Sequence, residues 1–406
     1  MAVVRTPIHV KVVALPNGVV LSSPLGDIEV TTTHPELSDL AEACDYAAWY
    51  FLPVAMRLDR PLHIAGRGTS KTIENWQKLT AIWQGWLPGH FYEQRLTFDQ
   101  VSVSKGKARR RSATPDLLYY SGGLDAAHAG LMRLAKGQKQ HLLTVQGMDY
   151  NVKDRRRFAA LLSKTETFTR ELSDIRIVVK SDAYVLYNKL GVNFGRHHLI
   201  HAFALAGAGF FHAKTYANLL LADDEPLAIQ FLGFPWGTNA ATNALFDDGG
   251  TKFVTLERDA SRLEKIRTVF ASETAMRSLA FCWNRSIQPE NCGMCEKCLR
   301  TKLLSLAEFG EVPDIFRNKA IPQNWAFRFT HRGTEGFFFV KEIFDRARMT
   351  GHEGCFPDFE RSVQTLIRRY ELLRRLEKIW PSILHTGLAA TLLAKLPVRS
   401  PERSPD

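Results

Sequence analysis

The chain has 406 residues, 45% of them hydrophobic, and a formal net charge of +11 at pH 7. These values exclude a small disulfide-stapled domain and a low-complexity disordered chain, and they predict two or three globular domains. The longest apolar run, residues 202–213, is too short to span a membrane, and no N-terminal signal is visible. We therefore expect a cytoplasmic protein that does not enter a membrane. The positive charge would suit ATP, RNA or an acidic protein and does not select among them.

The first hundred residues combine β-rich runs with stretches of helical periodicity. The β-rich runs are residues 8–14, 18–22 and 27–33, and the helical periodicity covers residues 35–56 and 70–86. A basic stretch without an apolar pattern follows at residues 105–111 and ends at Pro115, which predicts a linker. We expect residues 1–115 to form an N-terminal α+β region that docks a partner.

Beyond Asp116 the pattern changes to short apolar strands that alternate with helices. Strands are expected at residues 117–120, 142–146, 175–179 and 227–232, with helices that begin at residues 126, 154 and 196. This alternation predicts an α/β domain over residues 116–310, built on a parallel sheet with helices on both faces. Residues 311–406 are expected to form a helical C-terminal extension, with a charged amphipathic stretch at residues 359–380 and a disordered tail at residues 397–406.

A glycine-rich loop joins the first of these strands to its helix. The loop reads Ser121-Gly122-Gly123-Leu124-Asp125. Adjacent glycines let the backbone approach an anion closely, and the amide groups at the start of a helix hold phosphate. A plain tight turn is the alternative interpretation. The loop resembles the SGGxD[ST] loop of the PP-loop ATP pyrophosphatases, except that Ala126 stands where that family has a hydroxyl residue.

Four of the six cysteines crowd into a short segment, which is typical of a metal site rather than a disulfide framework. They are Cys282, Cys292, Cys295 and Cys298. Four thiolates can close on one tetrahedral zinc ion, and an iron-sulfur cluster is the rival interpretation. A zinc ion with four thiolate ligands has no open position, so we expect a structural rather than a catalytic role.

The two motifs together resemble those of QueC, the 7-cyano-7-deazaguanine synthase family of PP-loop enzymes. The resemblance implies ATP and Mg²⁺ as well as structural Zn²⁺, and it implies roles for individual residues. Catalytic roles fall to Ser121, Asp125 and Arg196. Nucleotide contacts fall to Ser121, Gly122, Gly123, Leu124, Asp125 and Gly147, and substrate contacts fall to Asn239 and Asp247.

The chain is longer than the resembling core, which points to a partner. Enlarged QueC-like proteins of this kind occur in antiphage defence operons of the Qat and CBASS types. The resemblance therefore implies adenylation of 7-carboxy-7-deazaguanine, followed by amide formation with the amino terminus of a partner protein. A conventional nitrile-forming synthase that uses ammonia, a tRNA-modifying PP-loop enzyme and a non-catalytic ATP-sensing subunit stay open. The usual QueC stretch Tyr-Pro-Asp-Cys-Arg is absent from this sequence.

Overall fold

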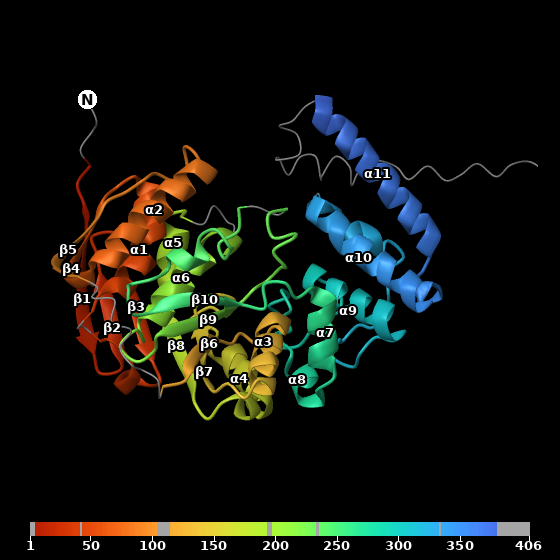
Figure 1. Cartoon of the computed structure of the whole chain (residues 1–406), viewed down its shortest axis with the longest axis horizontal. Coiled ribbons are helices and arrows are strands. Elements are labelled where there is room, and N and C mark those ends of the chain that lie inside the picture. The colour runs from red at the N-terminus through yellow and green to blue at the C-terminus, as the bar shows by residue number, and fades with distance from the viewer. Residues whose placement is uncertain are drawn as a thin grey trace, which may run out of the picture. The chain divides into compact units, whose positions relative to one another are not determined.

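The computed structural model describes residues 5–40, 43–103, 114–192, 197–232, 235–332 and 334–379. The chain divides into two compact units, Met1–Ala280 and Phe281–Asp406, whose elements are drawn in Figure 1. Among the described residues, none of the helices combines the length and the apolar character that a membrane span requires.

A ten-stranded, mostly parallel sheet forms the centre of the first unit. Its strands are β1 (Ile8–Leu15), β2 (Gly18–Ser22), β3 (Ile28–Thr32), β4 (Leu62–Thr69), β5 (Leu96–Ser102), β6 (Asp116–Tyr119), β7 (Gln140–Gln146), β8 (Arg176–Ser181), β9 (Asn218–Ala222) and β10 (Lys252–Leu256). They lie in the order β10-β9-β6-β7-β8-β3-β2-β1-β4-β5. The pairs β1–β2, β2–β3 and β3–β8 are antiparallel, and the other pairs are parallel.

The N-terminal strands continue the same sheet across residue 115, where the sequence predicted a domain boundary. Strand β3 pairs with β8, and Val30 lies opposite Ser181 in that register. An alternating pattern of buried and exposed residues in β1 and β3 places Ile8, Val10 and Val30 in one core with residues of the later strands. The boundary between compact units follows Ala280, not residue 310.

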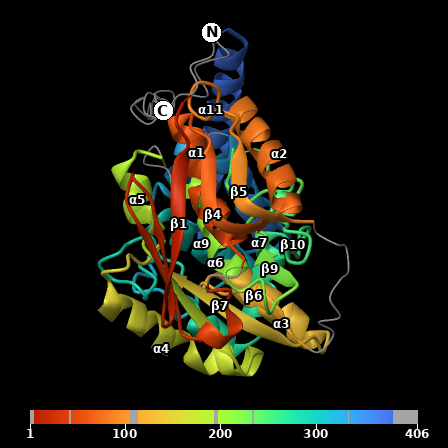
Figure 2. The ribbon, with the colours of Figure 1, turned by 90° about the vertical axis from the view of Figure 1, so that its left-hand side faces the viewer.

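Helices cover the two faces of the sheet in separate groups. The helices of this unit are α1 (Asp45–Leu58), α2 (Ser70–Trp86), α3 (Leu124–Ala135), α4 (Arg155–Leu172), α5 (Ala183–Lys189), α6 (His197–Phe210), α7 (Arg262–Phe270) and α8 (Glu273–Ser278). On one side α1 packs against α6, and on the other α3 packs against α7 and α4 against α8 (Figure 1). Figure 2 shows the N-terminal strands β1, β4 and β5 from the side, with α2 beside β5.

The strand expected at residues 227–232 is wrong. These residues form turns, and Leu227, Phe231 and Leu232 are exposed. The strand instead occupies Asn218–Ala222, where three consecutive leucines are buried between β6 and β10. Apolar character alone could not separate the two runs, since both are short and leucine-rich.

The second unit is helical beyond its cysteine segment. It contains α9 (Glu296–Phe309), α10 (Thr334–Thr350) and α11 (Phe359–Ile379), with short 3₁₀ segments at Trp325–Arg332 and Glu353–Cys355. The indole of Trp325 is fully buried and packs against the rings of Phe344 and Phe356, each with its centroid 5.1 Å away. The linker expected at residues 105–111 and the tail at residues 397–406 lie outside the described residues.

We predict that Trp49→Ala destabilises the first unit by about 3 kcal/mol, because truncation of a large aromatic leaves a cavity. Trp49 of α1 is fully buried, and its ring contacts Phe210 of α6 and Phe246 at centroid distances of 5.7 Å and 5.4 Å. Urea unfolding measures the loss, and Val13→Ala on the exposed side of β1 is the control. If the N-terminal strands of the variant unfold at a lower urea concentration than the rest of the unit, the ten strands do not unfold as one cooperative sheet.

Candidate functional site

The glycine loop lies between the end of β6 and the start of α3. Gly122 has φ +82°, a left-handed conformation that favours glycine, and its carbonyl accepts a hydrogen bond of 2.8 Å from the Ala280 amide. The Gly123 amide donates to Ser121 Oγ at 3.3 Å, and Gly123 is the N-cap of α3. The amides in the first turn of a helix have no acceptor within the helix, so this loop presents donors suited to an anion.

The strand order places this loop at a reversal of the chain's path through the sheet. From β6 the chain proceeds to β7 and β8 on one side, and it returns to β9 on the other side of β6. The connections that follow the neighbouring strands β6 and β9 therefore lead in opposite directions. In open α/β sheets, ligands bind in the crevice that forms at such a point, at the carboxyl ends of the strands.

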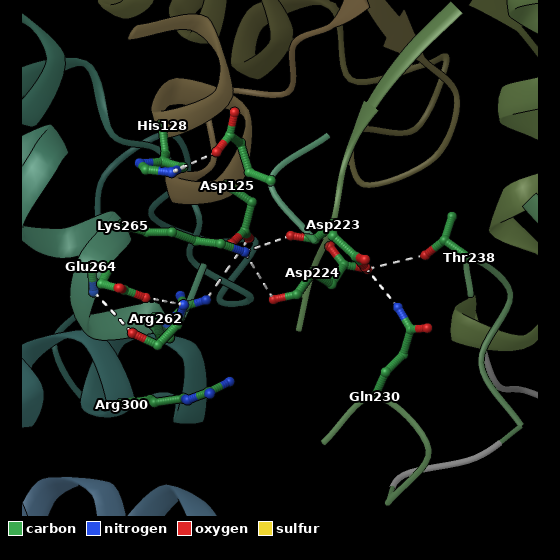
Figure 3. Close-up of polar contacts among 12 residues, drawn as sticks. Asp125, His128, Asp223, Asp224, Gln230, Thr238, Arg262, Glu264, Lys265 and Arg300 are labelled. Atoms are coloured by element: carbon green, nitrogen blue, oxygen red, sulfur yellow. Dashed lines mark hydrogen bonds and ion pairs between the residues drawn. The ribbon is translucent and has the colours of Figure 1, made fainter. Parts of the chain in front are cut away.

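Two cations of α7 lie beside the Asp125 carboxylate (Figure 3). Lys265 Nζ is 2.8 Å from Asp125 Oδ1, and an Arg262 nitrogen is 3.8 Å from Asp125 Oδ2. The start of α7 is fixed by a capping box in which Ser261 and Glu264 exchange hydrogen bonds. One helical turn separates Arg262 from Lys265, so both side chains reach the same carboxylate.

Lys265 also reaches the connection that follows β9. Its ammonium group donates to the main-chain oxygens of Asp223 at 2.5 Å and Asp224 at 3.4 Å. The Asp224 carboxylate accepts hydrogen bonds from the Trp236 indole and the Thr238 hydroxyl. Segments that follow β6, β9 and β10 therefore meet around one buried ammonium group.

Asp223 is a buried acid at this point of the sheet. Burial, reinforced by the neighbouring Asp224 charge, raises the pKa of Asp223 to about 7. Its Oδ1 accepts a hydrogen bond of 2.7 Å from Gln230, whereas its Oδ2 has no hydrogen-bond partner within the described part of the chain. His128 of α3 is also buried, and burial followed by the Lys265 charge lowers the pKa of its imidazole.

Sequence reasoning missed Arg262, Lys265, Asp223 and Asp224, although α7 carries a usable signal. Its buried positions are Arg262, Lys265, Ile266 and Val269. This spacing is the core-facing stripe of an amphipathic helix, and two charged residues occupy it. Long charged side chains are rarely buried without a partner, so such positions mark a buried ion pair.

Gly147 lies at the end of β7, next to the glycine loop's strand. A Cβ atom at this position would lie 1.7 Å from the Ser181 carbonyl oxygen at the end of β8. The amide of Gly147 donates to the Tyr150 carbonyl at 2.8 Å. Glycine is therefore required here by close strand approach, and the expected nucleotide contact stays a prediction. Leu124 is buried in the first turn of α3, where only its main chain could meet a phosphate.

Both expected substrate contacts make hydrogen bonds within their own loops, and their roles stay predictions. Asn239 is fully buried, and its amide is occupied by Trp236, Ala241 and Thr242 of its own loop. Asp247 precedes β10 and so lies at the amino edge of the parallel strands, opposite the carboxyl ends. Its Oδ1 accepts from the Gly249 amide. Arg196, expected to face phosphate, lies outside the described residues.

The cysteine cluster belongs to the second unit. The sulfur atoms of Cys282, Cys292, Cys295 and Cys298 all lie within 4.8 Å of one another. Four sulfurs that bind one zinc ion at about 2.3 Å stand about 3.8 Å apart. The Cys282–Cys295 separation is 3.8 Å, so the donor set fits a tetrahedral metal ion. The amides of Met294 and Cys295 donate to Cys292 Sγ, from 3.2 Å and 3.1 Å.

A buried lysine lies on the helix that carries the last ligand. Lys302 of α9 is fully buried and donates to the carbonyls of Asn318 and Ala320 at 3.2 Å and 2.8 Å. The Asn318 amide donates in turn to the Cys292 carbonyl at 3.3 Å. Four thiolates around a divalent zinc ion carry a net charge of −2, so a nearby buried ammonium group is electrostatically favourable.

Comparisons of the chain with models of protein families, with curated proteins and with solved structures gave no match. The function must therefore be inferred from the two motifs and from the geometry around them.

We predict that Asp223→Asn changes the pH dependence of stability. A pKa of about 7 in the folded state exceeds the unfolded value of about 3.9, so the folded chain binds this proton more tightly. The stability that this carboxyl contributes is complete below about pH 4 and is lost as the pH rises through 7. The variant should therefore gain stability relative to the wild type between about pH 5 and about pH 8. Urea unfolding checks this, with exposed Asp259→Asn as the control.

We predict that the purified protein contains about one zinc ion per chain and that Cys298→Ser loses it, because a structural site needs all four thiolates. Elemental analysis measures the metal, and thermal unfolding measures the accompanying loss of stability. Cys355→Ser is the matched control, since Cys355 is an exposed thiol outside the cluster. Iron and acid-labile sulfide in place of zinc would contradict the prediction.

Proposed function

We propose that this chain is an ATP pyrophosphatase of the PP-loop type that activates a carboxylate as its adenylate and passes the acyl group to an amine. The observation that carries the proposal is the glycine loop at the carboxyl end of β6. It combines a helix N-terminus, an exposed serine hydroxyl and an ion-paired aspartate at the reversal of strand order. An anion of the size of pyrophosphate suits such a place.

The loop's own groups account for the phosphate half of the reaction. Amides at the start of α3 and the Ser121 hydroxyl would donate hydrogen bonds to the β and γ phosphates of ATP. Attack of the carboxylate on the α phosphorus forms the acyl-adenylate and releases pyrophosphate. Fixed donors at the leaving group stabilise the charge that develops there without reorganisation during the reaction.

Asp125 is the residue of the loop that would hold magnesium. Asp125 offers an oxygen ligand, is partly exposed, and stands one residue beyond the buried Leu124 at the start of α3. When bound, Mg²⁺ would neutralise charge on the phosphate oxygens. Lys265 contacts the first oxygen of this carboxylate and Arg262 approaches the second, so a magnesium ion would share the carboxylate with these two cations.

The identity of the acid and of the amine rests on the resemblance to QueC. That resemblance favours 7-carboxy-7-deazaguanine as the acid and the amino terminus of a partner protein as the amine. Transfer forms the amide C–N bond, breaks the acyl–phosphate C–O bond, and releases AMP and a proton. Antiphage defence would be the setting of this reaction.

A second candidate is a subunit that binds ATP without turnover. Two observations favour it: Ala126 carries no hydroxyl where PP-loop enzymes have one, and the Asp125 carboxylate is already paired with Lys265. If the protein binds ATP but forms no AMP with any acceptor, the result would support this candidate and contradict the enzyme.

We predict that Asp125→Ala abolishes AMP formation while the fold and the metal content stay unchanged. Mass spectrometry of reactions with ATP, magnesium and 7-carboxy-7-deazaguanine, with and without ammonium, would score AMP and every deazaguanine product. Exposed Asp259→Ala is the matched control and should react as the wild type does.

The products then separate the alternatives. An adenylate or amide that never becomes a nitrile would indicate another acceptor, whereas a nitrile would identify a conventional synthase. Undiminished AMP formation by Asp125→Ala would contradict the assignment of the loop.

A further inference from the structure

The Lys265 ammonium group lies behind the Asp125 carboxylate. The Lys265 side chain is 2% exposed, whereas that of Asp125 is 22% exposed. A ligand that reaches the loop therefore meets the carboxylate and not the ammonium group. Lysine offers three N–H donors, and the three oxygens around Nζ belong to Asp125, Asp223 and Asp224.

These three oxygens come from both sides of the strand-order reversal. Asp125 follows β6, and the two carbonyls follow β9 (Figure 3). A buried ion pair contributes little net stability compared with well-packed apolar residues, so stability alone does not account for an ammonium group here. The arrangement does fix one carboxylate and two connections relative to one another, which apolar side chains could not do with the same directionality.

We propose that Lys265 is a positioning residue for the ATP pyrophosphatase reaction: it fixes the Asp125 carboxylate at the phosphate loop and joins that loop to the connection after β9. On this assignment Lys265 acts through Asp125 and not by contact with ATP or the acid. The assignment rests on the proposed function, because positioning has a kinetic meaning only if the loop binds ATP. The link that Lys265 makes between the glycine loop and the connection after β9 can be tested without any turnover.

Several charged groups would remain around Asp125 if the Lys265 ammonium group were removed. Arg262 of α7 remains at 3.8 Å, His128 lies one turn along α3, and the acids that follow β9 stay nearby. Without its nearest cation the carboxylate loses its fixed orientation, so the effect on catalysis should appear in kcat rather than in KM for ATP.

The test compares the full-length wild type with Lys265→Met, Lys265→Arg and Arg267→Met. Arg267 is an exposed cation on the same helix and serves as the matched control. Hydrogen exchange followed by mass spectrometry reports on residues 120–127 and 223–232 separately from the central strand β7. Exchange of labelled pyrophosphate into ATP, measured as a function of ATP concentration, reports on activation of the acid and separates kcat from KM.

We expect Lys265→Met to speed hydrogen exchange in both segments while β7 stays protected. Its pyrophosphate exchange should fall by about 100-fold, mainly in kcat, because a misplaced group costs about this much. Lys265→Arg should recover part of the rate, and Arg267→Met should match the wild type.

Faster hydrogen exchange in only one of the two segments, or throughout the first unit, would contradict the proposal that Lys265 joins them. An unchanged kcat for pyrophosphate exchange in Lys265→Met would overturn the kinetic role. If the wild type itself exchanges no pyrophosphate, the proposed function fails, and the hydrogen-exchange comparison still decides whether Lys265 joins the two segments.

Discussion

The position of β6 between β7 and β9 is the constraint on which the site depends. Because the chain leaves β6 in one direction and returns on the other side, the connections after β6 and β9 lead away from each other, which is the arrangement at which open α/β sheets bind ligands. The glycine loop, the Asp125 carboxylate and the buried Lys265 all follow from that arrangement. The N-terminal strands extend the sheet at β8, two strands away from β6, and so leave this arrangement unchanged.

Local patterns in the sequence were sufficient for much of this architecture. Alternating apolar strands and helices predicted the α/β core, and the loop after residue 120 was located because strand, glycines and helix follow one another directly. The spacing of Cys292, Cys295 and Cys298 predicted a metal site, and the cysteine sulfurs do converge. The glycine loop could be predicted because its contacts lie within one short segment. The metal site could be predicted because closely spaced cysteines occur in few other settings.

Contacts between distant segments could not be predicted in this way. The pairing of β3 with β8 joins residues about 150 positions apart, and antiparallel pairing leaves no mark on either strand alone. Lys265 lies 140 positions from Asp125, and only its place on the buried stripe of α7 distinguishes it from a surface lysine. Polar loop residues such as Asn239 and Asp247 also serve their own turns, as the Asn239 amide does, so sequence alone does not separate that role from a substrate contact.

The junction at β3 also governs how the protein can acquire its structure during synthesis. Strands β1 to β5 emerge first, but β3 stays an open sheet edge until β8 has been made, and α1 lacks its packing partner α6 until residue 210. An unpaired edge beside exposed apolar surface invites pairing with other chains. Folding of the N-terminal strands must therefore wait for the later half of the sheet, and a ribosome that stalls between them would leave a nascent chain in need of a chaperone.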